Sequence, residues 1–166
     1  MAIIRAKGFT LRPPKLSDAE NIYFLQQDKE AKRMFVSVPK SADQVKKGII
    51  AERKRTDRET LVIDIGGEAV GDICISMIVP NLKGKIGYWI AKEHRGKGLM
   101  TKVVKIATDH WFKKYNLRRI YANTRPFNKP SARVLEKAGF RFEGRIRKDV
   151  LKDGKHYDNL LFAKIR

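Results

Sequence analysis

Apolar and polar residues alternate along some segments of the chain and recur at helical spacing along others, so both strands and helices are expected. Strands are predicted where the alternation, or a short apolar run, is closed by turn residues. The predicted strands cover residues 9–12, 61–65, 69–79, 86–90, 120–122, 140–151 and 155–165. Gly66-Gly67 and Asp153-Gly154 are typical hairpin turns and join two pairs of these strands.

Four segments are predicted to be helical. Ser17-Asp18-Ala19-Glu20 and Ser41-Ala42-Asp43-Gln44 each have the capping-box pattern of a helix start. Apolar residues at helical spacing from Met100 to Trp111 predict a third helix. Asn128 is expected to cap a fourth helix, which Gly139 ends.

The order of these elements predicts an α/β (α+β) fold. A strand and two helices precede an antiparallel meander, which is followed by a helix, a strand, a helix and two strands. We therefore expect a mixed, mostly antiparallel central sheet of six to seven strands, flanked by about four helices. A length of 166 residues favours a single domain, residues 1–166.

Charge is distributed unevenly along the chain. The formal net charge is +19, and residues 83–166 carry 23 Lys and Arg against 7 Asp and Glu. Such a field attracts anions, for example nucleic acid, an acidic protein or a phosphate-rich cofactor. The alternative is a lysine-rich surface adapted to heat, but this predicts matching glutamates, which the second half lacks.

Several protein classes are excluded by composition. The single cysteine, Cys74, is not enough for a disulfide framework or a thiolate metal cluster. The first residues lack the apolar stretch of a signal peptide, and no apolar run approaches the ~20 residues of a membrane span. We expect a soluble, cytoplasmic protein with no membrane association.

A short basic glycine turn, Arg95-Gly96-Lys97-Gly98, lies between an apolar strand and an amphipathic helix. The glycines allow backbone conformations and close approaches that a Cβ would block. The helix that begins near Gly98 offers unpaired N–H groups and the positive end of its dipole. This setting predicts a pyrophosphate-binding site, although neither a Walker loop nor a G-x-G-x-x-G fingerprint is present.

Residues 86–101 resemble the acetyl-coenzyme A motif of the GNAT N-acetyltransferase superfamily, Q/R-x-x-G-x-G/A, and residues 128–140 resemble its next motif. Leu11-Arg12-Pro13 and residues 153–158 are similar to the RimJ/RimL-type branch, which includes ribosomal-protein N-acetyltransferases. Spermidine acetyltransferases share much of this pattern. The resemblance covers nearly the whole chain, and it implies a GNAT fold with acetyl-coenzyme A as cosubstrate and no metal.

The resemblance also implies where acetyl-coenzyme A binds. Strand 86–91 would diverge from strand 118–123, with the pantetheine arm in the gap and one backbone N–H polarising the thioester carbonyl. The implied cofactor-binding residues are Trp89, Ile90, Ala91, Arg95, Gly96, Lys97, Gly98, Leu99, Met100, Thr101, Asn123, Asn128 and Lys137. The motif's first position is Glu93 here, an anion that we expect to brace the loop through Arg95 or Lys97 instead of contacting phosphate.

The catalytic position implied by the resemblance is at the start of the fourth helix. Many family members have a proton-donating tyrosine where this chain has Leu135. The RimJ/RimL-type branch has an earlier serine, Ser131 here, which with Asn128 is the catalytic candidate. The Ser131 hydroxyl either donates a proton or orients a water, or it only helps to cap the helix.

No general base stands out in the sequence. Asp72 lies in the middle of a predicted strand, and alternation alone does not decide whether it faces the acceptor. Tyr88 and Trp89 are expected to be part of the hydrophobic core or of the wall of the groove, and not acid–base groups. His94, His110 and His156 show no metal-ligand spacing and are interpreted as surface or satisfied histidines.

The acceptor is expected to be a primary amine, with direct attack in a ternary complex. The overall positive field disfavours a polyamine, so the N-terminal α-amine of a protein, particularly an acidic or ribosomal one, is preferred. A polyamine or another small amine remains the first alternative. A non-catalytic GNAT-like protein that binds RNA or the ribosome is the second. Association with the ribosome or an acidic protein is compatible with the charge, and a monomer and a homodimer are both open.

Overall fold

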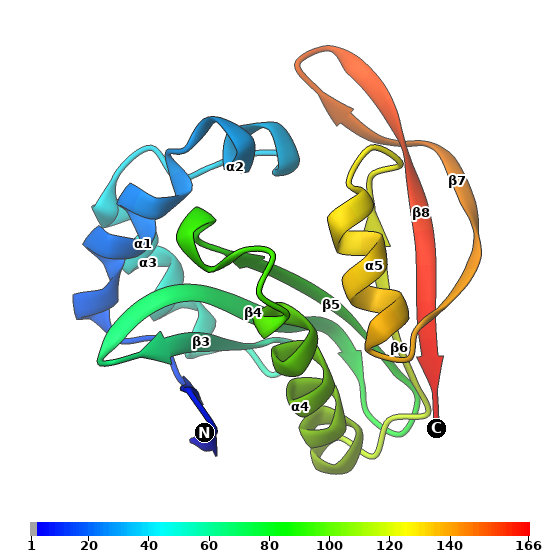
Figure 1. The fold of residues 1–166 in the computed structure, drawn as a ribbon, viewed down its shortest axis with the longest axis horizontal. Helices are drawn as coiled ribbons and strands as arrows, with labels where there is room; N and C mark the ends of the chain where they lie inside the picture. The colour runs from blue at the N-terminus through cyan, green and yellow to red at the C-terminus, as the bar shows by residue number, and fades with distance from the viewer. Residues whose placement is uncertain (1–2) are drawn as a thin grey trace.

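The fold is an eight-stranded sheet with helices on both faces, seen in a computed structural model that describes residues 3–166 (Figure 1). The strands lie in the order β1-β2-β3-β4-β5-β6-β8-β7. They are β1 (Ile4–Ala6), β2 (Phe9–Arg12), β3 (Glu59–Ile65), β4 (Glu68–Val79), β5 (Lys83–Ile90), β6 (Arg119–Thr124), β7 (Arg141–Lys152) and β8 (Lys155–Ile165). The helices are α1 (Ala19–Gln26), α2 (Lys29–Met34), α3 (Ala42–Glu52), α4 (Leu99–Lys114) and α5 (Lys129–Lys137), with 3-10 turns η1 (Leu16–Asp18) and η2 (Lys92–His94).

The predicted fold class is confirmed, with one more strand and one more α-helix than expected. β5 and β6 are parallel, and every other pair of neighbouring strands is antiparallel. The additional strand is β1, which pairs with β2. Its three residues are half-buried or exposed and carry too little alternation to be recognised from sequence.

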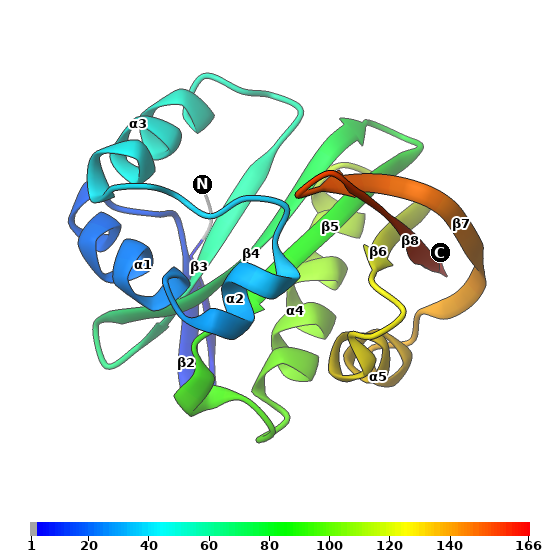
Figure 2. The ribbon, with the colours of Figure 1, turned by 90° about the horizontal axis from the view of Figure 1, so that it is seen from above.

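Each face of the sheet has its own core and its own helices. The larger core joins α4 and α5 to one face, around fully buried side chains such as Ile63, Ile73 and Trp111. The smaller core joins the other face to α1 through Ile22 and Trp89. Figure 2 shows α1 and α3 beside β3 and β4, at a distance from α5 and the β7–β8 hairpin.

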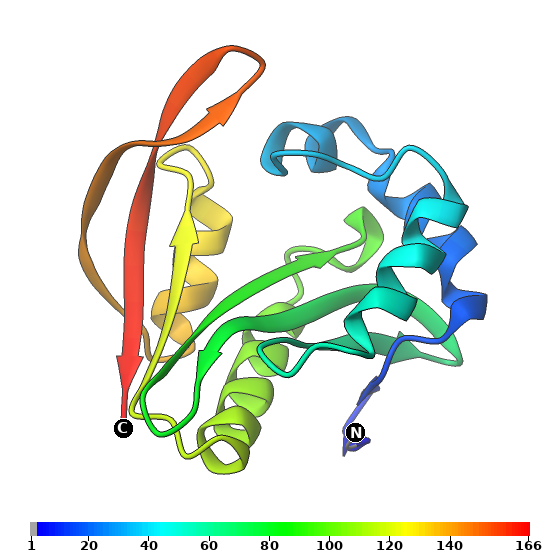
Figure 3. The same cartoon turned by 180° about the vertical axis from the view of Figure 1, so that it is seen from behind.

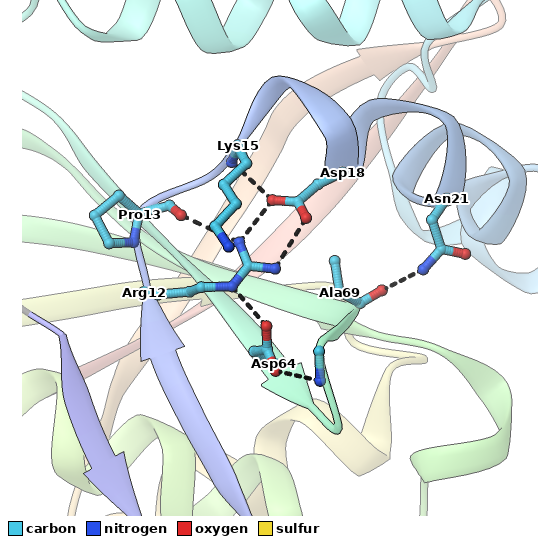
Figure 4. A network of polar contacts seen from close by, with 8 residues as sticks. Arg12, Pro13, Lys15, Asp18, Asn21, Asp64 and Ala69 are labelled. Atoms are coloured by element: carbon cyan, nitrogen blue, oxygen red, sulfur yellow. Dashed lines mark hydrogen bonds and ion pairs between the residues drawn. The ribbon is translucent and has the colours of Figure 1, made fainter.

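Buried Arg12, from the predicted Leu11-Arg12-Pro13 motif, joins the first helices to the sheet (Figure 4). Its Nη1 and Nη2 donate to Asp18 at 2.7 and 2.9 Å, and its Nε donates to Asp64 of β3 at 2.6 Å. The hydrogen bond to Asp18 raises the pKa of Arg12. Burial opposes ionisation of Asp18, but bonds from Arg12 and the Lys15 N–H hold the pKa of this carboxyl below its usual value.

The predicted helix starts are partly right. The expected Ser17–Glu20 capping box is wrong, because the capping residue is Lys15, two positions earlier, whose N–H donates to the Asp18 carboxylate at 2.7 Å. The cap at Ser41 is confirmed, with its hydroxyl accepting the Gln44 N–H. Helix α2 was not predicted; Asp28 caps it by accepting the N–H groups of two of its residues.

Helix α4 is held at its C-terminal end by a buried carboxylate. Glu59 of β3 accepts hydrogen bonds from Trp111 Nε1 and Tyr115 Oη, at 2.8 and 2.9 Å, and pairs with Lys114. Burial disfavours the ionised form, but these three donors lower the pKa of Glu59. Within residues 3–166, no helix is long and apolar enough to span a bilayer.

Candidate active site

The two central strands separate where the cofactor is expected. β5 and β6 pair from Lys83–Arg119 to Ile86–Ala122, and beyond these pairs the strands share no register. Figure 3 shows the two ribbons side by side at one end and apart at the other. The predicted splay is therefore present, and it begins at Gly87 on β5 and Asn123 on β6.

Only some of the predicted backbone groups of β5 face the splay. The Ala91 N–H donates to Val70 of β4 at 2.8 Å, so it is already occupied. Alternate residues of an antiparallel ladder direct their N–H groups to the same side. The backbone N–H of Trp89 therefore also points to β4, and the backbone N–H groups of Tyr88 and Ile90 point into the splay. Of the predicted residues Trp89, Ile90 and Ala91, only Ile90 directs its N–H into the splay. Tyr88, which was not among the predicted residues, does so as well.

The glycine loop presents a row of free donors. Within residues 3–166, the N–H groups of residues 96–101 donate to no protein acceptor. Gly96 and Gly98 have φ of +76° and +75°, and a Cβ built at either would meet nothing within 4 Å. The glycines are therefore needed for the backbone conformation, and the space in front of the donors is open. This arrangement fits a pyrophosphate.

Arg95 is engaged by helix α2. Its guanidinium pairs with Asp28 at 3.2 Å and with Glu30, and its Nε donates to the Ile90 carbonyl at 3.0 Å. Its N–H donates to Lys92. The expectation that Glu93 braces the loop through Arg95 is wrong, because the acids of α2 hold that side chain. Arg95 therefore ties α2 to the loop instead of facing a phosphate, whereas Lys97 is exposed.

Polar atoms at the end of β6 lack partners inside the protein. Asn123 Oδ1 and Thr124 Oγ1 are buried and make no hydrogen bond within the described residues. Since most buried polar atoms are paired, unpaired ones beside a splay indicate a polar ligand. Asn128 caps α5 as predicted by accepting the Ser131 N–H at 3.2 Å. Lys137 lies exposed in the last turn of α5.

Ser131 is paired with a tyrosine of β5. Tyr88 Oη lies 2.9 Å from Ser131 Oγ and 3.2 Å from its carbonyl oxygen, so the phenol reaches across the splay to α5. Burial raises the pKa of Tyr88, which therefore remains a neutral donor. Leu135 is fully buried in the larger core, so the position of the missing tyrosine is used for packing.

Asp72 lies on the sheet face covered by α1 and α3. It is directly opposite Val62 and Trp89 in the ladder, and both pack into the smaller core. Trp89 Nε1 donates to Asp72 Oδ2 at 2.5 Å. Burial raises the pKa of Asp72 to about 6, although the hydrogen bond from Trp89 opposes the shift.

We call this side of the sheet the acceptor face and define it by Asp72, Trp89 and Asn123. Lys85 lies four residues before Trp89 on β5, so both side chains point to the same face. Lys85 is opposite Tyr121, which places Tyr121 and then Asn123 on this face as well. The cofactor loop and Ser131 belong to the α4–α5 side. Asp72, Trp89 and Asn123 therefore approach the splay from one face, and the glycine loop and Ser131 approach it from the other.

The histidines and the cysteine take no part in this arrangement. His94 and His156 lie in η2 and at the exposed start of β8. His110 is not satisfied as expected, since its Nε2 is buried without a partner and burial lowers its pKa. Burial raises the pKa of the Cys74 thiol to about 11. No group of potential metal ligands occurs among residues 3–166.

Sequence comparison assigns the chain to a family. Residues 9–141 match the acetyltransferase (GNAT) domain, so the chain belongs to this family. A putative ribosomal N-acetyltransferase, YdaF of Bacillus subtilis, is 30% identical over 166 residues, which cover 95% of this chain and 91% of the relative.

Solved structures share the fold over nearly the whole chain. A ribosomal-protein-S5-alanine acetyltransferase from Vibrio fischeri superposes with a TM-score of 0.88 at 27% identity, covering 99% of this chain and 97% of the other. Mycobacterium smegmatis RimJ in complex with a CoA-disulfide gives 0.83 at 27% identity, covering 99% and 86%. The chain is an N-acetyltransferase of the GNAT family, whose members use acetyl-coenzyme A. This favours the enzymatic prediction over the non-catalytic one.

Sequence reasoning missed the contacts made between distant segments. The pairing of Arg95 with α2 and of Tyr88 with Ser131 joins residues 65 and 43 positions apart. The Gly-Tyr-Trp sequence at 87–89 was a usable signal, because alternation places Tyr88 and Trp89 on opposite faces.

Proposed function

We propose that this enzyme transfers the acetyl group of acetyl-coenzyme A to the N-terminal α-amine of a protein, by direct attack in a ternary complex. The names of the relatives support ribosomal proteins as the substrate class. The observation that carries the proposal is the carboxylate of Asp72 on the acceptor face, held by Trp89 and with a pKa of about 6.

The pKa of Asp72 matches an α-amine better than a side-chain amine. An α-ammonium group has a pKa near 8 and a lysine or polyamine ammonium one near 10.4. Transfer of a proton to a base with a pKa of about 6 is therefore uphill by roughly 3 kcal/mol for the first and 6 kcal/mol for the second. Asp72 is thus proposed to receive the proton of the attacking α-amine.

The other residues of the splay are assigned to the cosubstrate. Acetyl-coenzyme A supplies an activated acyl group on a thiol that leaves as a weak base. We assign its pyrophosphate to the N–H groups of residues 96–101, and its thioester carbonyl to the Ile90 or Tyr88 N–H. The Ser131 hydroxyl is assigned to the leaving sulfur as a hydrogen-bond donor, held in place by Tyr88. Asn128 is assigned to the arm from the α5 side, and Asn123, whose side chain lies on the acceptor face at the edge of the splay, is assigned to it from the other side.

The charge of the surrounding segments argues against a polyamine. Lys152 of the β7–β8 hairpin bonds to the carbonyls of Lys32 and Arg33 at the end of α2, so these two segments meet beside the acceptor face. Figures 1 and 3 show the hairpin tip and α2 leaning toward each other. Residues 28–34 carry three Lys or Arg against two Asp or Glu, and residues 145–158 carry five against three, so the net charge between them is positive and disfavours a polycation.

The test is a competition assay with labelled acetyl-coenzyme A, N-terminal peptides and spermidine. The proposal predicts label in the peptides, and activity that falls as pH drops below about 6 because Asp72 becomes protonated. Turnover of spermidine alone contradicts the proposal. As a second readout, acetyl-coenzyme A in a hundredfold excess over its Kd should stabilise the protein by about 2.7 kcal/mol.

A further inference from the structure

Arg125 is a buried cation without a hydrogen-bonding partner. It directly follows β6, at the open end of the splay, and is only 7% exposed. Its Nη1 is buried and unpaired, and within residues 3–166 no side-chain nitrogen of Arg125 donates to any acceptor. Buried arginines are almost always paired, because an unpaired buried charge is strongly unfavourable. An anion from outside the chain would therefore be a favourable partner for the Arg125 guanidinium.

The arginine lies on the acceptor face. Asn123 belongs to that face, and the alternation of β6, continued one residue past its last residue Thr124, points to the same side for Arg125. The Arg125 guanidinium carbon lies 5.4 Å from the ring centre of Tyr157 on β8. Tyr157 lies four residues before Leu161 on β8, so the two side chains share a face, and Leu161 is opposite Asn123. The register of β6 and β8 and the contact of Arg125 with Tyr157 therefore both place Arg125 on the acceptor face.

Aromatic rings hold this guanidinium in position. Tyr157 contacts Phe127 edge to face, with ring centres 6.5 Å apart, and the Arg33 guanidinium of α2 lies 4.8 Å from the Phe127 ring. Stacking on a ring satisfies the flat surface of a guanidinium but leaves its N–H edge free. The N–H edge of Arg125 is therefore held in one orientation, and its buried Nη1 has no partner in the described part of the protein.

We propose that Arg125 is a recognition site for a carboxylate of the acceptor, so that the preferred acceptors carry an acidic group close to the amine. A carboxylate matches the two parallel donors of a guanidinium edge. This inference rests on the proposed function for the position of the amine. Two acceptors have this chemistry: a protein N-terminus followed by Asp or Glu, and a free amino acid.

The cosubstrate is a poor alternative partner for Arg125. Its phosphates are assigned to residues 96–101 at the start of α4, on the other face of the sheet. Among residues 3–166, Arg125 forms no salt bridge with any carboxylate. Asp149, which contacts Asn123 of the same face, accepts a hydrogen bond from Asn159 at 2.7 Å. The acceptor remains as the source of the anion.

The experiment compares paired peptides that differ by one charge. Each peptide carries one Asp at the second, third or fourth position, and its partner carries Asn there. Free aspartate and free alanine form a separate arm. For the wild-type enzyme we expect kcat/KM for the best Asp peptide to exceed that of its Asn partner by about 10-fold or more. Arg125→Met should reduce this ratio to about 1.

Arg118→Met is the matched control. Arg118 is an exposed arginine that directly precedes β6, so the variant removes the same charge at the other end of the same strand. It should keep the wild-type preference. The ratio is internal to each enzyme, so partial misfolding of Arg125→Met lowers both rates together and does not imitate the expected result. Calorimetry with acetyl-coenzyme A checks that this variant still binds its cosubstrate.

Peptide binding to the enzyme loaded with coenzyme A is measured in parallel, which separates the two proposals. Equal binding and equal turnover of Asp and Asn peptides overturn the recognition site but leave the proposed function intact. Selective, Arg125-dependent use of free aspartate, with no peptide turned over, supports the site and contradicts protein acetylation. A preference that survives in Arg125→Met overturns the assignment to this residue.

Discussion

The cosubstrate and the acceptor are expected to meet two regions that are built in different ways. The cosubstrate side consists of main-chain N–H groups within one continuous stretch, Ile90 and residues 96–101. The acceptor face consists of side chains from β4, β5, β6 and β8, with α2 beside it. Main-chain donors are common to all sequences, whereas side chains vary, so the first region carries a shared chemistry and the second carries the choice of amine.

The largest expected effect lies on the acceptor face. Asp72→Asn should lower kcat/KM for an α-amine peptide by about 10²- to 10⁴-fold, the usual contribution of a positioned base, and leave the Kd for acetyl-coenzyme A unchanged. The wild-type rate should fall below pH of about 6, and this limb should vanish in the variant. Steady-state kinetics over pH 5 to 8 and calorimetry measure both quantities.

Stability provides the control for this variant. The pKa of Asp72 is raised in the folded state, so the folded protein loses stability as the pH rises from the unfolded value through about 6. Asn cannot ionise and can still accept the Trp89 N–H, so Asp72→Asn should unfold at or above the wild-type Tm at pH 7. A large drop in Tm would mean that Asp72 is structural.

The next effect isolates the cosubstrate side. Replacing both Gly96 and Gly98 by Val should weaken acetyl-coenzyme A binding by about 100-fold, because the positive φ values and two charge-assisted contacts are lost. The control replaces Gly66 and Gly67, whose φ values of +64° and +93° impose similar strain in a distant turn. Retained affinity in the first variant, measured by calorimetry, would disprove the pyrophosphate site.

A smaller effect is expected where the two sides meet. Ser131→Ala and Tyr88→Phe should each lower kcat by about 10-fold, and the double variant should be little slower than Ser131→Ala, because one residue acts through the other. Tyr115→Phe removes another buried phenol far from the splay and should leave kcat unchanged. Independent, multiplying losses would show that Tyr88 does not position Ser131.

The smallest effect concerns the link between the two regions. Arg95→Met removes the pairing with Asp28 and Glu30, a contact of partly exposed groups worth about 1 kcal/mol or less. We expect about a 5-fold rise in both the Kd for acetyl-coenzyme A and the KM for peptide. Arg55→Met, which breaks an exposed pair with Asp57, should change neither. An effect on only one substrate would remove the proposed link.

The two regions also differ in how far the sequence predicts them. The glycine loop is recognisable because its chemistry lies in local order, with glycines directly before a helix. The splay follows from the resemblance to the GNAT family and is present in the structure. The acceptor face depends on register and on contacts between distant segments. Alternation could not orient Asp72 until its pairing with Val62 and Trp89 was known.

Local signals also misled where tertiary contacts compete with them. Ser17 has the capping pattern, but Asp18 is the residue whose carboxylate accepts the backbone N–H at the start of the turn. The same carboxylate also pairs with buried Arg12. The local sequence around Arg95 is typical of a phosphate ligand. Its guanidinium instead pairs with Asp28 and Glu30 at the start of α2, a helix of six residues that the sequence pattern does not predict. Both errors arise from charges whose partners are distant in sequence.

The most direct test of the account is one peptide that carries both a free N-terminal α-amine and a lysine ε-amine. The peptide is incubated with the enzyme and acetyl-coenzyme A at pH 7, and the acetylated position is located by fragmentation mass spectrometry. The account predicts acetylation of the α-amine alone, because Asp72 suits an ammonium with a pKa near 8. Acetylation of the lysine, with the α-amine left free, would contradict it.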